Sequence, residues 1–109
     1  MIPSSVRIYV CVLPQDMRRS FDGLALAAQQ VLGKEPKSGA VFCFINKRGN
    51  RLKVLWWDRN GYCMLYKRGD EAKFVLPDQP RGELALQIDA AGLRKLVTGV
   101  PRQTRRKRA

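Results

Sequence analysis

The residues best suited to chemistry in this chain are cations and aromatic rings gathered between positions 51 and 68. This stretch, RLKVLWWDRNGYCMLYKR, places two apolar segments around Asn60 and Gly61, a pair that favours a two-residue β-hairpin turn. Alternate side chains of such a hairpin share one face. One predicted face combines cations with flat rings, and its members are Arg51, Lys53, Leu55, Trp57, Met64, Tyr66 and Arg68. A face of this kind can contact phosphates while its rings stack on bases.

The opposite face of the predicted hairpin is almost purely apolar, and we assign it to the core. Its members are Leu52, Val54, Trp56, Cys63 and Leu65. Two alternatives remain open: the first face fills a second apolar layer under lysine and arginine stems, or a one-residue slip of register exchanges the faces. Turn cations are exposed in either register, so Lys47, Arg48 and Arg59 are predicted phosphate contacts, with ordinary solvated charge as the alternative.

Acid–base catalysis has little support in this sequence. Histidine is absent, which excludes Ser-His, Cys-His and His-metal arrangements. Asp16, Asp22 and Asp58 could meet around Mg²⁺, but each has a local role as a helix cap, a helix residue or a turn residue. A ribonuclease-like site built from Tyr, Lys, Arg and Asp stays open as an alternative. We predict a non-enzymatic protein with no catalytic residues, no metal and no other cofactor.

The three cysteines indicate a reducing environment. Cys11, Cys43 and Cys63 all lie in apolar runs and form no CxxC pair, a pattern typical of reduced, buried thiols in a cytosolic protein. The N-terminus lacks the features of a signal peptide, and no apolar run approaches the ~18 residues of a membrane span. We therefore expect no membrane partner and a cytoplasmic location, with association with the nucleoid as an option.

The charge balance predicts an anionic partner. Lys and Arg number 21 against 9 Asp and Glu, for a formal net charge of +12 in 109 residues. The C-terminal segment RQTRRKRA is strongly basic, and its last cations are Arg105, Arg106, Lys107 and Arg108. The rest of the chain keeps a positive excess as well, so we predict that both body and tail contact nucleic acid, the commonest partner for such a balance. A merely basic protein is the alternative.

The elements that must position these residues follow from periodicity. Asp16 is expected to cap a helix over 17–32 that ends at Gly33, and Asp89 to cap a short C-terminal helix. Strands are predicted at 6–12, 40–45, 51–57, 62–68, 73–76 and 83–88.

This order predicts an α+β fold. We expect an antiparallel, strongly curved, five- to six-stranded meander resembling a half-barrel, with one long helix after the first strand and one short C-terminal helix. The middle strands are apolar on both faces, so the face away from the long helix needs curling or a partner to cover it. The predicted domain spans residues 1–100, and residues 101–109 form a basic, disordered tail.

Three segments resemble a known family. They are DMRRSFDGLALAAQQVLG (16–33), KRGNRLKVLWWDRNGYCMLYKR (47–68) and FVLP (74–77). In order and spacing they are similar to the small accessory protein of insertion-sequence-66 elements, the product of the second open reading frame, labelled TnpB. That label is shared with an unrelated RNA-guided nuclease, for which this chain is far too short.

The resemblance implies a role in transposition beside a separate transposase. It supplies no catalytic residues, since none is established in the family. DNA is therefore the expected partner, the element's transposase a further one, and self-association is open. In the alternative reading, the protein is an adaptor that docks on the transposase, or on a second copy of itself, through the Trp57 and Tyr66 face without binding DNA.

Overall fold

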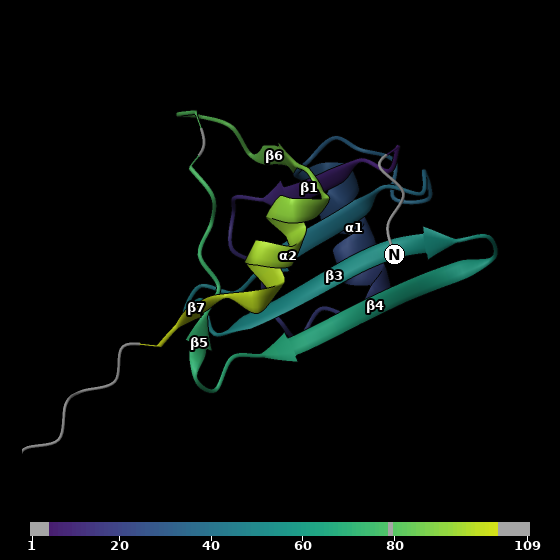
Figure 1. Cartoon of the computed structure of the whole chain (residues 1–109). Coiled ribbons are helices and arrows are strands. Elements are labelled where there is room, and N and C mark those ends of the chain that lie inside the picture. The colour runs from purple at the N-terminus through teal and green to yellow at the C-terminus, as the bar shows by residue number, and fades with distance from the viewer. Residues whose placement is uncertain (1–4, 79, 103–109) are drawn as a thin grey trace, which may run out of the picture.

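The protein is an open mixed sheet with a helix on each face (Figure 1). A computed structural model describes residues 5–78 and 80–102. Within these residues the sheet has five strands in the order β4-β3-β2-β1-β6, and β5 and β7 form a separate two-stranded ribbon. In chain order the elements are β1 (Ile8–Cys11), α1 (Phe21–Gln30), β2 (Val41–Ile45), β3 (Arg51–Asp58), β4 (Gly61–Arg68), β5 (Ala72–Lys73), β6 (Ala85–Ile88), α2 (Ala90–Thr98) and β7 (Val100–Pro101).

The α+β class is confirmed, but the antiparallel meander is wrong. β1 pairs parallel to β2, with Ile8 opposite Val41, and the final strand of the sheet, β6, returns to pair antiparallel with β1. Parallel neighbours need a long crossover, which the chain between β1 and β2 supplies by way of α1. Only β2, β3 and β4 form the expected antiparallel succession. β5 leaves the sheet and pairs with β7, a strand that periodicity did not predict.

The predicted strong curvature is also wrong, because α2 covers the face that α1 leaves free. On the α1 side, Leu24 packs with Phe42 and Leu55. On the α2 side, Leu93 and Leu96 pack with strand residues that include Leu52, Val54 and Cys43. A sheet that is apolar on both faces therefore remains open, since a helix buries each face and closure is unnecessary.

The first helix is shorter than predicted. It begins at Phe21, after Ser20 at the N-cap, and it ends at Gln30. Asp16 caps no helix, because its carboxylate instead accepts hydrogen bonds from the backbone N–H and guanidinium of Arg18. Beyond the end of α1, Gly33 adopts the positive φ expected of it, +66°. The predicted cap of the C-terminal helix is confirmed, because the Asp89 carboxylate accepts the Gly92 N–H of α2 at 2.7 Å.

The hairpin of β3 and β4 keeps its predicted faces but turns one residue earlier. Asp58 pairs with Gly61, so Arg59 and Asn60 form the turn, and Arg59 carries the positive φ of 53°. A turn at Asn60 and Gly61 would place Trp57 opposite Met64, but Trp57 lies opposite Tyr62, and the two rings meet edge-on at 4.9 Å. Because the register moves by two residues, every side chain stays on its predicted side of the sheet. The face predicted to bind nucleic acid is nevertheless wrong as an open surface, because its middle packs on α1, where Leu55 is fully buried.

Candidate anion-binding cleft

The turn between β2 and β3 holds two predicted phosphate contacts at one end of the sheet. Asn46 organises this turn, since its side-chain oxygen accepts the backbone N–H groups of Asn50 and Arg51, both at 3.0 Å. Lys47 and Arg48 occupy the tip, and both side chains are exposed. The expectation that this tip is cationic and solvent-facing is therefore met by the fold.

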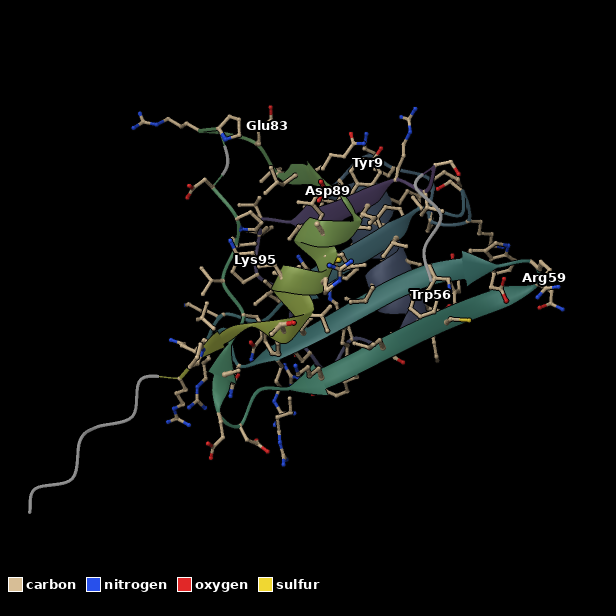
Figure 2. All side chains as sticks on the ribbon, in the orientation of Figure 1. Tyr9, Trp56, Arg59, Glu83, Asp89 and Lys95 are labelled. Carbon is tan, nitrogen blue, oxygen red and sulfur yellow. The ribbon has the colours of Figure 1, made fainter. Side chains whose placement is uncertain are left out.

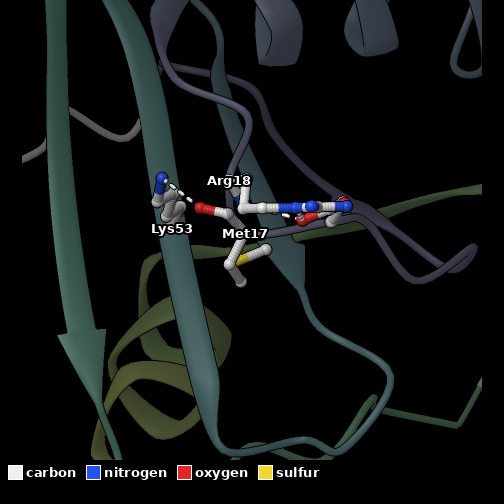
Figure 3. Close-up of polar contacts among 4 residues, drawn as sticks. Met17, Arg18 and Lys53 are labelled. Atoms are coloured by element: carbon white, nitrogen blue, oxygen red, sulfur yellow. Dashed lines mark hydrogen bonds and ion pairs between the residues drawn. The ribbon is translucent and has the colours of Figure 1, made fainter.

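The loop between β1 and α1 forms the wall that faces this turn. Lys53 anchors it, because its ammonium donates to the backbone oxygen of Met17 at 2.8 Å (Figure 3) and to that of Arg19 at 2.7 Å. The Lys53 residue is only 6% exposed. Its charge is thus committed to the loop, and it lies inside the protein where the sequence placed a surface phosphate contact.

An exposed ion pair sits on the same loop. The Arg18 guanidinium contacts the Asp16 carboxylate at 2.6 Å (Figure 3). The hydrogen bonds from Arg18 lower the pKa of the Asp16 carboxyl to about 2. Asp16 is ionised at neutral pH, and the Arg18 guanidinium offsets its negative charge at this wall.

Between this loop and the β2–β3 turn lies an open cleft of about 540 Å³. Four cations, one carboxylate and one aromatic ring line it, and they are Arg18, Lys47, Arg48, Arg51, Asp16 and Tyr66. Arg51 donates to the Tyr66 hydroxyl at 2.6 Å, and Tyr66 is 48% exposed. Residues far apart in the sequence are thus gathered into one cationic site with an accessible ring.

The remaining predicted residues on the hairpin are divided between its two ends. Arg68 lies at the cleft end of β4, where its guanidinium pairs with Asp70 at 2.8 Å. Arg59 lies at the free tip of the hairpin (Figure 2), and Trp57 stands near it, half-buried, with the Lys37 ammonium 4.8 Å from its ring. At ~3.3 Å per residue, an eight-residue strand separates the two ends by roughly 23 Å. The residues predicted to form one binding surface therefore lie at two separate sites, one at each end of the hairpin.

The β5–β7 ribbon places further cations at the end of the sheet that holds the cleft. Sequence reasoning did not predict these cations as part of the site. Arg102 donates its backbone N–H to Glu71 at 2.9 Å, and a second hollow of about 390 Å³ is lined by Arg48, Lys73 and Arg102. Pro101 and Arg102, assigned to the tail by sequence, thus pair with the domain. The predicted contacts Arg105, Arg106, Lys107 and Arg108 lie outside the described residues. No local pattern marks Lys73 or Arg102, because their proximity to Arg48 arises only through β5–β7 pairing.

The cysteines and the possible metal ligands form no further candidate site among the described residues. Cys11 and Cys43 are buried, and Cys63 is partly buried. Burial raises the pKa of the Cys43 thiol to about 12, so this thiol is protonated at neutral pH. In the described part of the chain, no three metal-ligating side chains gather as a group. Across these same residues, no helix has the length and apolar character needed to cross a membrane.

Comparison with known proteins identifies the family to which this chain belongs. The family described as IS66 Orf2 like protein matches residues 6–107. The chain belongs to this family. The IS66 Orf2-like proteins it resembles include y4hO of Sinorhizobium fredii, which is 39% identical over 102 residues covering 92% of this chain and 87% of that protein. A second, y4jC of the same species, is 34% identical over 95 residues covering 87% and 80%, respectively. Both carry the description "uncharacterized protein". No solved structure matches the chain.

Membership of the IS66 Orf2-like family confirms the resemblance seen in the sequence and identifies an accessory protein of an insertion element. The structure shows how the family-like segments meet. The DMR segment supplies one wall of the cleft, and the segment beginning at Lys47 supplies the other.

Proposed function

We propose that this accessory protein binds the phosphate backbone of DNA at the cationic cleft, without catalysing a reaction. The observation that carries the proposal is the convergence of Arg18, Lys47, Arg48 and Arg51 on one cleft. Among the described residues, no ion pair engages Lys47, Arg48 or Arg51, so their charges are available to a ligand. DNA is favoured over other polyanions because an insertion element moves as DNA.

The proposed contacts are revised from the sequence by burial and position. Lys47, Arg48 and Arg51 form the centre, with Tyr66 as a ring on which a base could stack and Arg68 at the margin. The cations of 105–108 belong to the proposal too, because the chain leads to them from Arg102 at this same end. Lys53 supports the cleft wall from inside the protein and does not contact DNA itself. Arg59 and Trp57 lie at the far end of the hairpin, too distant to contact the same phosphates as the cleft.

Phosphate binding predicts a measurable response to salt. Each cation that neutralises a phosphate contributes roughly −0.9 to the slope of log K against log salt on duplex DNA. Three cleft contacts alone would therefore give a slope of about −3, and tail contacts would steepen it. A binding constant that is indifferent to salt would remove the proposal.

The deciding experiment compares two triple variants by fluorescence anisotropy on labelled duplex DNA. One variant replaces Lys47, Arg48 and Arg51 with alanine; its control replaces Arg81, Arg94 and Lys95, which are exposed and lie away from the cleft. Both lose the same charge. We expect the cleft variant to bind at least about tenfold more weakly, with a salt slope shallower by about 2–3. Equal losses in both variants would show that net charge, and not the cleft, supplies the affinity.

A second candidate function is an adaptor that docks on the transposase. The supporting observation is the separate cluster of Trp57, Tyr62 and Lys37 at the other end of the hairpin, away from the cleft. Here Trp57→Ala should abolish capture of the transposase while DNA retention stays at the wild-type level. Loss of DNA retention with transposase capture intact would count against the adaptor.

A further inference from the structure

The outer edge of β4 is an unusually open strand edge. β4 is eight residues long and has β3 on one side, and nothing in the described part of the chain pairs with its other side. The opposite edge of the sheet, β6, has only four residues. From Gly61 to Tyr66 the strand carries neither charge nor proline. Proteins usually protect such an edge with charges, prolines, bulges or short length.

The two cations at the end of β4 do not protect this edge. The Lys67 ammonium turns towards α2 and donates to the backbone oxygen of Val97 at 2.7 Å. The Arg68 guanidinium is held by the Asp70 carboxylate at 2.8 Å. Both charges are thus engaged within the protein.

The ladder pattern shows which backbone groups of β4 are free to pair. Gly69 donates its N–H to Asn50 at 2.8 Å, so the pair that continues the β3–β4 register there is hydrogen-bonded. Hydrogen-bonded and non-hydrogen-bonded pairs alternate in an antiparallel ladder. Tyr62, Met64 and Tyr66 therefore direct their N–H and C=O groups away from β3, in a row available to another strand.

An exposed leucine lies between two members of this row, Met64 and Tyr66. Leu65 is 40% exposed on the α2 side of the sheet. It borders an apolar groove of about 470 Å³ that also touches Trp56, Leu93 and Val97. The apolar surface beside the edge is thus larger than one side chain.

We propose that β4 pairs antiparallel with β4 of a second copy of this chain, centred on Leu65. If a two-fold axis crosses the sheet, one residue of β4 must lie opposite its own copy. We place Leu65 on the axis, because it is exposed, borders the apolar groove and lies between the free backbone groups of Met64 and Tyr66. Met64 pairs with the partner's Tyr66 through the free backbone groups. The two leucines form a non-hydrogen-bonded pair, in which side chains approach closely.

Charge distribution favours this antiparallel arrangement over a parallel one. Antiparallel pairing places Arg68 opposite the partner's Tyr62, beside a hairpin end where Asp58 and Arg59 form an ion pair and offset each other's charge. Parallel pairing would bring the two Lys67–Arg68 ends together. The arrangement also puts both cationic clefts on the same face of one ten-stranded sheet. It does not depend on the proposed DNA function, and its test contains no nucleic acid.

The test is sedimentation equilibrium of the full chain from micromolar to near-millimolar concentration. One strand edge is a small interface and each chain carries +12, so we expect a weak dimer that strengthens from about 0.15 M to about 1 M salt. Leu65→Lys should weaken association at least about tenfold by placing like charges at the axis. Leu26→Lys, which makes the same change at a 45% exposed site on α1, should leave it unaltered. A chain that stays monomeric at both salt concentrations, or a dimer that Leu65→Lys leaves intact, would overturn the proposal.

A cross-linking measurement guards against misfolding of the lysine variant. In a Cys63→Ser background, Leu65→Cys places two thiols across the axis at the ~4.5 Å Cα separation of a non-hydrogen-bonded pair, within disulfide range. Mild oxidation should give a covalent dimer. Leu26→Cys in the same background should stay monomeric. Equal cross-linking of the two variants, or none at position 65, would contradict the register.

Discussion

Lys53 shows how far one side chain can depart from its local appearance. In sequence it is a cation among others on a mixed hairpin face. In the fold its ammonium satisfies two carbonyl groups of the loop before α1, and it lies 4.6 Å from the centre of the Tyr66 ring. Lys53 therefore positions the Met17–Arg18 wall of the cleft.

Replacement of Lys53 by methionine tests this role. The change keeps the length of the side chain but leaves the carbonyls of Met17 and Arg19 without their donor. We expect the free energy of unfolding to fall by about 2 kcal/mol, because bonds from charged donors are among the stronger ones. Urea denaturation followed by tryptophan fluorescence measures it.

The matched control is Lys95→Met, at an exposed position of α2. This change should stay within about 0.5 kcal/mol of wild type. If the two variants unfold at the same urea concentration, Lys53 is not a structural anchor.

At the scale of elements, the β5–β7 ribbon decides where the basic C-terminus joins the domain. Gly99 makes the ribbon possible, because it leaves α2 with φ +75° and its Cα passes close to β5. A Cβ at this position would stand 2.9 Å from the Lys73 carbonyl oxygen. Both the backbone conformation and the close approach therefore require glycine here.

Gly99→Ala should accordingly cost about 2–3 kcal/mol of unfolding free energy, through backbone strain at φ +75° and ψ −179°, a region essentially confined to glycine, and through the clash with Lys73. Gly33→Ala is the control, since Gly33 has φ +66° and an added Cβ would meet nothing within 4 Å. It should lose only about 1 kcal/mol, from strain alone. Thermal unfolding of the two variants measures both losses, and equal losses would mean that neither the β5 contact nor the backbone conformation at Gly99 adds to the cost.

For the whole molecule, stability depends on burial of both faces of the sheet. Leu24 of α1 is 0% exposed against one face, and Leu96 of α2 is 4% exposed against the other. The apolar strands are therefore covered without any second protein. An exposed apolar sheet face is thus no longer a reason to expect an adaptor.

Both Leu24→Ala and Leu96→Ala should lower the unfolding free energy by about 2–4 kcal/mol, the usual cost of a buried leucine truncation. Leu26→Ala, at the 45% exposed position on α1, should cost below about 0.5 kcal/mol. Chemical denaturation of the three variants provides the comparison. A negligible effect at Leu96 would show that α2 does not seal its face.

The sequence by itself determined the family, the α+β class, the approximate elements, the grouping of the hairpin side chains into two faces and the cationic turn at Lys47 and Arg48. These features are local: periodicity, caps and turn residues act over a few neighbours, and the family-like segments are contiguous. Only the tertiary structure decided the parallel β1–β2 pair, the β5–β7 ribbon, the burial of Lys53 and the distance between Arg59 and the cleft. Each of these depends on contacts between distant segments. Such contacts leave no periodic trace, because a lysine that binds two carbonyls of another loop has the same sequence pattern as one that faces water.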